Sequence, residues 1–262
     1  MSETVQSKTV TIDYDDAIAI VTIDFVQRRN ALSIEVREAL YEALFAVMAD
    51  PDCRAIVLTG AGGCFCAGGD LSSMEGLTGI KGRARLARVH RLVRLLLEGE
   101  KPVIAAVEGW AVGAGMSLAA ACDVVVAASD AQFACSFNKV GLLPDLGAAY
   151  VLPLRMGLGR ARLAMMTGDT LTAEAAERAG LVEIVTAPGQ ALAEALALAR
   201  RLAEAAPAAL GLTKALLARM PQPLDEMLRA EADAQALLFT TEDFAEGRAA
   251  FLEKRKPRFS GR

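Results

Sequence analysis

Histidine, long apolar runs and paired cysteines are scarce in this sequence of 262 residues. A single histidine, His90, and the lack of any Cys/His cluster disfavour a transition-metal site, so we expect no metal. The five cysteines are an odd count without a CxxC pair, which indicates free thiols in a reducing compartment, and we expect the cytoplasm. The longest apolar stretch, residues 109–122, is rich in glycine and too short to span a bilayer.

Strong charge of one sign is also missing, because the formal net charge is -4. We therefore expect neither a nucleic-acid partner nor a membrane partner. The basic run at residues 253–262 is an exception that could contact phosphates or form a solvated tail. The first ten residues lack the basic and apolar regions of a signal peptide, so none is expected. Hydrophobic residues make up 53% of the chain, enough for a substantial core.

Strand-like and helix-like segments alternate through the first half of the chain. The patterns predict strands over residues 17–25, 54–60, 102–109 and 123–129, and helices over 33–49, with Ser33 as N-cap, and 83–99. This alternation predicts an α/β fold. From residue 189 the sequence becomes rich in Ala and Leu, which predicts a helical region that packs on partner subunits or on its own core. We divide the chain into a core, 1–188, and a helical C-terminal region, 189–262.

Two glycine-rich loops, "FCAGGDL" (65–71) and "GWAVGAGMS" (109–117), each follow a predicted strand, and the second leads into a predicted helix. Small residues let backbone N–H groups approach a ligand, and two such groups aimed at one point form an oxyanion hole. Neither loop matches a nucleotide-binding pattern. Each loop alone also fits a packing role.

The segments "RRNALS", "LTGAGGCFCAGGDL", "KPVIAAVEGWAVGAGMSLAAACDVVVAAS", "MTGDTLTAEAAERAGLVEIV" and "FLEKRKPRF" together resemble the enoyl-CoA hydratase/isomerase (crotonase) superfamily. The resemblance implies a spiral of ββα units with a helical C-terminal trimerisation region, usually in a dimer of trimers. It also implies an acyl-CoA thioester as substrate, bound to the 1–188 core, with no cofactor beyond the coenzyme A of the substrate itself.

The resemblance also implies roles for individual residues. The backbone N–H groups of Gly69 and Ala114 would form the oxyanion hole, which adjoins Gly113. Contacts with CoA would come from Arg28, Arg29, Ala31, Ala67, Asp70 and Leu71, while Phe251 and Lys254 would approach the CoA of another subunit. The family's usual "NRP" is absent before "NALS". Residues 71–80 would line the acyl pocket, and Glu75 within them is a possible second acid or an exposed helix-end residue.

The two glutamates used by hydratases of this superfamily fall at Ser117 and Phe137, neither of which is acidic. One carboxylate remains on a matching segment, Asp145 of "GLLPDLGAAYVLP". This segment and the C-terminal sequence most resemble the branch that contains 1,2-epoxyphenylacetyl-CoA isomerase and related enoyl-CoA isomerases. Asp145 is therefore expected to be the acid/base of a double-bond shift, or else the N-cap of the helix that follows it.

Three other functions stay open from the sequence. One is hydration of an enoyl-CoA by another water-activating route. A second is a dehalogenase-like or hydrolytic reaction in which Asp145 is the nucleophile and His90 assists it. The third, of another class, is an oligomeric scaffold that binds CoA without catalysis.

Overall fold

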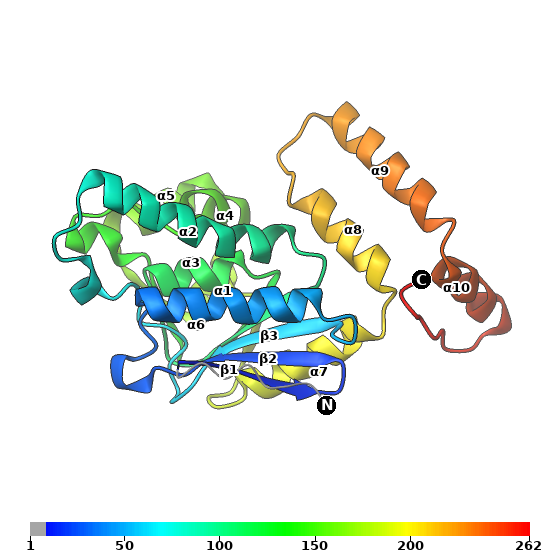
Figure 1. Ribbon diagram of the computed structural model, residues 1–262, viewed down its shortest axis with the longest axis horizontal. Helices are drawn as coiled ribbons and strands as arrows, with labels where there is room; N and C mark the ends of the chain where they lie inside the picture. The colour runs from blue at the N-terminus through cyan, green and yellow to red at the C-terminus, as the bar shows by residue number, and fades with distance from the viewer. Residues whose placement is uncertain (1–8) are drawn as a thin grey trace.

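A six-stranded sheet forms the centre of the computed structural model, which describes residues 9–262 (Figure 1). Its strands, in spatial order, are β1 (Val10–Asp15), β2 (Ile18–Ile23), β3 (Ala55–Gly60), β4 (Val103–Val107), β6 (Val124–Ala128) and β9 (Ile184–Thr186). β1 and β2 pair antiparallel, and every other neighbouring pair is parallel. A smaller sheet contains β5 (Trp110–Val112), β7 (Gln132–Ala134) and β8 (Thr170–Thr172).

Helices cover both faces of the six-stranded sheet. Along β3, successive side chains point alternately into the two cores that these helices form with the sheet. Ile56 and Leu58 belong to the large core beneath α1 (Ile34–Ala49), α2 (Gly79–Glu98) and α3 (Ala114–Ala121). Ala55 and Val57 face the other way, into a second core beneath α7 (Ala191–Ala203). Figure 1 shows α1 and α7 on opposite sides of the strands. Strands buried on both faces are typical of parallel sheets and confirm the predicted α/β class.

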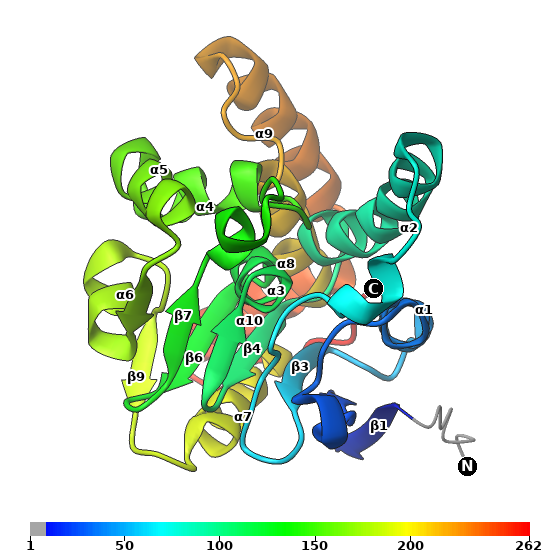
Figure 2. The ribbon, with the colours of Figure 1, turned by 90° about the vertical axis from the view of Figure 1, so that its left-hand side faces the viewer.

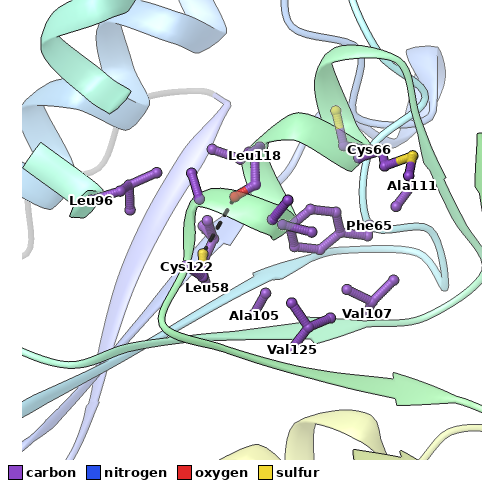
Figure 3. Packing of buried hydrophobic residues seen from close by; sticks show 14 of the residues in the cluster. Leu58, Phe65, Cys66, Leu96, Ala105, Val107, Ala111, Leu118, Cys122 and Val125 are labelled. Carbon is purple, nitrogen blue, oxygen red and sulfur yellow. Dashed lines mark hydrogen bonds between the residues drawn. The ribbon is translucent and has the colours of Figure 1, made fainter. Parts of the chain in front are cut away.

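Figure 3 shows α3 packed over the sheet, with Leu118 and Cys122 above Ala105 and Val125. The Cys122 thiol donates to the carbonyl oxygen of Leu118 at 3.5 Å. All five cysteines are buried and free, so the prediction of free thiols is confirmed. Burial raises the pKa of Cys66 and of Cys122 to about 12, so both thiols stay neutral near neutral pH.

The remaining elements connect these layers and extend the chain. They are the 3-10 helices η1 (Val26–Arg28), η2 (Leu71–Met74) and η3 (Ser136–Val140), and the helices α4 (Ala148–Met156), α5 (Leu158–Thr167), α6 (Ala173–Ala179), α8 (Pro207–Leu217), α9 (Leu224–Leu238) and α10 (Glu242–Glu253). No helix within residues 9–262 combines the length and the apolar character needed to cross a membrane.

The C-terminal helices differ in what they pack against. α7 covers the sheet, whereas α8 is tied to it through Lys214, whose ammonium pairs with Asp123 at 2.6 Å and donates to the carbonyl oxygen of Lys101 at 2.8 Å. α9 and α10 lie beyond α8, away from the sheet (Figure 1). The predicted helical region from residue 189 therefore contains one helix of the core and three helices that extend from it.

Candidate active site

The two glycine loops meet at the N-terminus of α3. A Cβ atom added to Gly115 would overlap the carbonyl oxygen of Cys66, and one added to Gly68 would lie 3.8 Å from the nitrogen of Ala114. No acceptor within residues 9–262 pairs with the N–H of Gly69 or with that of Ala114. The structure thus leaves two backbone donors free where the two loops come together.

Glycine at positions 68 and 113 lets the two loops lie this close together. Gly68 has a φ of +102°, and a Cβ atom there would lie 2.7 Å from the carbonyl oxygen of Val112. Gly113, the N-cap of α3, has φ 52° and ψ -116°, a conformation that other residues adopt only under strain. All eight residues of α3 are buried, so its N-terminus brings the positive end of a helix dipole into the interior.

Asp145 lies in the loop between η3 and α4, and its Oδ1 atom is buried without a hydrogen-bond partner among the described residues. The N-cap of α4 is Gly147, and no side chain donates or accepts a capping bond there. The alternative that Asp145 caps this helix is therefore wrong. The next residue, Leu146, is buried with a φ of 49°, an uncommon backbone conformation that holds Asp145 in place.

Burial raises the pKa of Asp145 above its ordinary value because water no longer solvates the charged form. Electrostatic interactions with Arg37, Arg85 and His90, in that order, lower the pKa of Asp145, but burial outweighs them. The Cys135 thiol also lies near Asp145, and the pKa of Cys135 is raised to about 11, mainly by burial and further by the carboxylate.

Arg37 is the residue of this site that sequence reasoning missed. It extends from α1 and is only 6% exposed. Its Nε donates to the carbonyl oxygen of Leu32 at 2.9 Å, while Nη1 and Nη2 are buried without a hydrogen-bond partner in the described chain. A Cβ atom on Gly69 would lie 3.2 Å from Nη2. A signal existed in the sequence, because Arg37 occupies the apolar stripe of α1 formed with Val36, Leu40 and Leu44.

Ser117 and Phe137, at the positions of the hydratase glutamates, are both buried beside this site. The Ser117 hydroxyl donates to the carbonyl oxygen of Gly113 at 3.2 Å. Phe137 lies in η3, and its ring is 3.9 Å from the Cβ position of Gly113. Neither side chain offers a carboxylate to a substrate.

The predicted CoA-contacting residues gather along one strip. The N–H of Ala67 donates to the carbonyl oxygen of Arg29 at 2.9 Å, and the N–H of Leu32 donates to that of Gly68 at 2.7 Å. The strip contains Arg28, Arg29, Ala31, Ala67, Asp70 and Leu71. The Asp70 carboxylate accepts from the backbone N–H of Ser72 at 3.1 Å and from its hydroxyl at 2.7 Å.

Asn30 organises this strip, and it too was missed from sequence. Its side chain is fully buried, accepts from the N–H of Phe25 at 2.9 Å, and donates to the carbonyl oxygens of Ala61 and Cys64 at 2.9 and 2.6 Å. Arg29 and Asn30 both have positive φ values, 49° and 58°. The side chain of Asn30 thus holds a left-handed turn against the loop that precedes Gly69.

Phe251 and Lys254 lie apart from this centre, whereas His90 and Glu75 are exposed residues closer to it. Phe251 and Lys254 are on and after α10, which lies away from α3 in Figure 1 and behind it in Figure 2, and Phe251 is 83% exposed. His90 is exposed and forms no hydrogen bond with the Oδ1 atom of Asp145 in the described part of the chain, although it is near enough to lower the pKa of Asp145. Glu75 is exposed at the end of η2. Across residues 9–262, no group of three or more His, Cys, Asp or Glu could hold a metal ion.

A cavity of about 250 Å³ lies between α1 and α2 and extends from Arg37. Ile34, Leu77 and Leu92 supply apolar walls. Its charged lining consists of four cationic side chains and one carboxylate: Arg37, Lys81, Arg85, Arg88 and Glu38.

Comparisons with known proteins agree with this geometry. The family model "Enoyl-CoA hydratase/isomerase" matches residues 13–262. A crotonyl-CoA hydratase of Syntrophomonas wolfei is 36% identical, and the alignment covers 95% of this chain and 97% of that protein. The 1,2-epoxyphenylacetyl-CoA isomerase of Escherichia coli is 37% identical, over 95% of this chain and 97% of that protein.

The crystal structure of an enoyl-CoA hydratase from Bacillus anthracis superimposes with a TM-score of 0.92 at 30% identity, covering 97% of this chain and 100% of that one. The chain belongs to the enoyl-CoA hydratase/isomerase family and has the crotonase fold. It is an acyl-CoA-handling enzyme of the isomerase or hydratase type, as the sequence predicted.

Proposed function

We propose that this enzyme shifts a double bond in an acyl-CoA by moving a proton between C2 and C4, with Asp145 as both base and acid. The observation that supports this most is the buried Oδ1 of Asp145, which has no hydrogen-bond partner among the described residues. An unengaged carboxylate oxygen can accept a proton. Its raised pKa makes it a stronger base than an ordinary aspartate.

In the proposed mechanism, the thioester oxygen of a 3-enoyl-CoA accepts hydrogen bonds from the N–H groups of Gly69 and Ala114. Asp145 removes a proton from C2, and the electron pair of that C–H bond delocalises into a dienolate whose charge collects on the thioester oxygen. The two donors and the α3 dipole stabilise that charge as it develops. Asp145 then returns the proton to C4, and the double bond comes to rest between C2 and C3.

This route uses a single carboxyl group and needs no second acid at Ser117 or Phe137. Hydration is the second candidate, because a relative of the chain is named a crotonyl-CoA hydratase. Hydration also requires a positioned water and an acid that protonates C2, and two glutamates usually share that work. Neither Ser117, whose hydroxyl donates to a carbonyl oxygen, nor Phe137 can replace them.

Substitution of Asp145 by Asn tests the proposal. Asp145→Asn keeps the size of the side chain but cannot accept the proton, so isomerase kcat should fall by about 10² or more. Affinity for a saturated acyl-CoA should remain near that of the wild type. Asp130→Asn, at an exposed aspartate outside the site, is the matched control and should retain full activity. Turnover that survives Asp145→Asn would contradict the role of Asp145, and fast hydration of a 2-enoyl-CoA would favour the second candidate.

We further propose that the chain assembles into trimers, paired into hexamers, in which Phe251 and Lys254 approach the CoA of a neighbouring subunit. The distance of α10 from α3 within one chain supports a contact made between subunits (Figure 1). Arg28 and Arg29 would contact the CoA bound to their own chain. Coenzyme A enters as part of the substrate, and the proposed chemistry uses no additional cofactor.

A further inference from the structure

Arg37 has a buried guanidinium group that the double-bond shift does not require. It is 6% exposed, and only its Nε has a hydrogen-bond acceptor, the carbonyl oxygen of Leu32. Nη1 and Nη2 have no partner within residues 9–262. Burying a charge with unpaired donors costs free energy, so such groups commonly mark a place where a ligand completes the pairing.

The anionic groups around Arg37 do not neutralise it. No ion pair within 4.0 Å joins Arg37 to Asp145 in the described structure, although Asp145 is near enough to affect the pKa of Arg37. Glu38, the one carboxylate in the lining of the cavity, pairs with Arg91 at 3.3 Å. The guanidinium of Arg37 therefore keeps two donors available.

The cavity beside Arg37 has the charged and apolar lining that suits an anion with an apolar chain. Its walls include apolar side chains from α1 and α2, while four cationic residues share the lining with one carboxylate. Arg85 is already fixed by bonds of 3.1–3.3 Å to Ser73. Arg37 is the most buried of these cations and lies nearest Gly69, where we place the thioester.

We propose that Arg37 binds a second carboxylate on the acyl group, so that the enzyme favours CoA monothioesters of dicarboxylic acids over neutral acyl-CoAs. Nη1 and Nη2 form the planar pair of donors that a carboxylate accepts in a bidentate arrangement. The methylene groups of such an acyl chain would lie along the apolar walls. This inference rests on the proposed acyl-CoA site and adds a substrate class to it.

Binding of saturated compounds separates this inference from the isomerase proposal, because a saturated acyl chain cannot undergo the double-bond shift. Calorimetric titration compares glutaryl-CoA with pentanoyl-CoA, and suberoyl-CoA with octanoyl-CoA, so that two chain lengths sample the reach to Arg37. The wild type should bind at least one diacid thioester about tenfold or more tightly than its neutral partner, the scale of a charge-assisted bidentate bond. Asp145→Asn should keep that preference.

Two substitutions identify Arg37 as the source of the preference. Arg37→Met keeps the length of the side chain without its charge, and should bind pentanoyl-CoA and octanoyl-CoA as the wild type does while losing the preference for diacids. Arg37→Lys keeps the positive charge but lacks the planar pair of donors, so it should retain only part of the preference for diacids. Arg94→Met, at an exposed residue of α2 outside the cavity lining, should leave all four affinities unchanged.

The opposite results overturn the inference. A wild type that binds diacid and neutral thioesters equally well would contradict it. So would a preference for diacids that persists in Arg37→Met, or an equal loss of affinity for both kinds of thioester in that variant. Thermal unfolding of Arg37→Met at or above the wild-type temperature confirms that its fold is intact. If that variant does not fold, the wild-type preference and the Arg37→Lys comparison decide the outcome.

Discussion

At the scale of single residues, the candidate site contains two ionisable groups that are buried with free hydrogen-bonding atoms. Asp145 presents a free oxygen and Arg37 two free nitrogens, and no ion pair within 4.0 Å joins them in residues 9–262. Two opposite charges that remain apart keep their affinity for other groups. Under the two proposals above, Asp145 accepts a proton from the acyl chain and Arg37 binds an anionic group on it.

The pH dependence of kcat/KM should report the raised pKa of Asp145. The base must be deprotonated, so activity should fall as pH drops through a pKa above the ordinary aspartate value of about 3.9. Arg37, Arg85 and His90 all lower that pKa, while burial dominates and raises it. Arg37→Met should therefore move the acidic limb to higher pH with a neutral 3-octenoyl-CoA substrate. An unmoved limb would show that Arg37 does not act on Asp145.

The contribution of Asp145 to the free energy of unfolding should decrease as pH rises, whereas activity should increase. A raised folded-state pKa means that the folded protein binds this proton more tightly than the unfolded chain does. The stabilising contribution is fully present at low pH and is lost as pH rises through the folded-state pKa. Above that pKa the ionised Asp145 costs stability, and Asp145→Asn should there unfold at an equal or higher temperature than the wild type. A clear drop in that temperature would indicate a structural role for the carboxylate.

Sequence reasoning identified Asp145 and the Gly69 and Ala114 loops through their resemblance to a known family, but it missed Arg37 and Asn30. The reason lies in what each residue contacts. Arg37 is of a residue type usually found at the surface, and only its place in the apolar stripe of α1 indicates that it is buried. Asn30 bonds with Phe25, Ala61 and Cys64, and only the folded chain brings these together.

At the scale of elements, the N-terminus of α3 is the part most sensitive to a backbone change. Ala114 is the first residue of that helix, where proline is tolerated because the N–H there has no partner within the helix. Ala114→Pro should therefore preserve the helix, remove one proposed oxyanion donor and lower kcat by about 10² to 10³. Circular dichroism and thermal unfolding check that the fold is retained. Full activity in a folded Ala114→Pro protein would exclude that N–H from catalysis.

Strands and helices of five or more residues were mostly predictable, and the three-residue strands were not. Helix α1 begins after Ser33 as predicted, because the Ser33 hydroxyl accepts from the N–H of Val36 at 3.2 Å. Helix α2 begins at Gly79, earlier than the predicted residue 83, since Thr78 caps it. The six-residue strand β1 was missed, as were the three-residue strands β5, β7, β8 and β9. A three-residue segment carries little periodicity, and pairing with strands distant in the sequence defines it.

At the scale of the whole molecule, α9 and α10 extend from the core with apolar side chains exposed. No residue of α9 is buried within one chain. The exposed apolar side chains of the two helices and the turn between them include Leu224, Leu228, Leu237, Phe239, Phe244, Phe251 and Leu252. Apolar surface of this extent commonly marks a protein–protein interface. It supports the proposed trimer, in which the helices of neighbouring subunits would cover it.

Sedimentation velocity at micromolar concentration should therefore give the mass of a trimer or hexamer. Replacing Leu228 and Leu237 together by Glu places charge on the exposed face of α9 and should reduce the mass toward that of one chain. Gln235→Glu, on the same helix, adds a charge without removing apolar surface and should keep the assembly. A wild type that sediments as a monomer would contradict the assembly and the contact of Lys254 with a neighbour's CoA.

The transfer of a proton by Asp145 between C2 and C4 is tested most directly by isomerisation of a 3-enoyl-CoA in deuterated water, with product analysis by mass spectrometry and NMR. A carboxyl group that exchanges with solvent between the two transfers should place deuterium at C4 of the wild-type product. Asp145→Asn should form neither the shifted product nor the deuterated one. Deuterated product at the wild-type rate from Asp145→Asn would contradict the central role of Asp145.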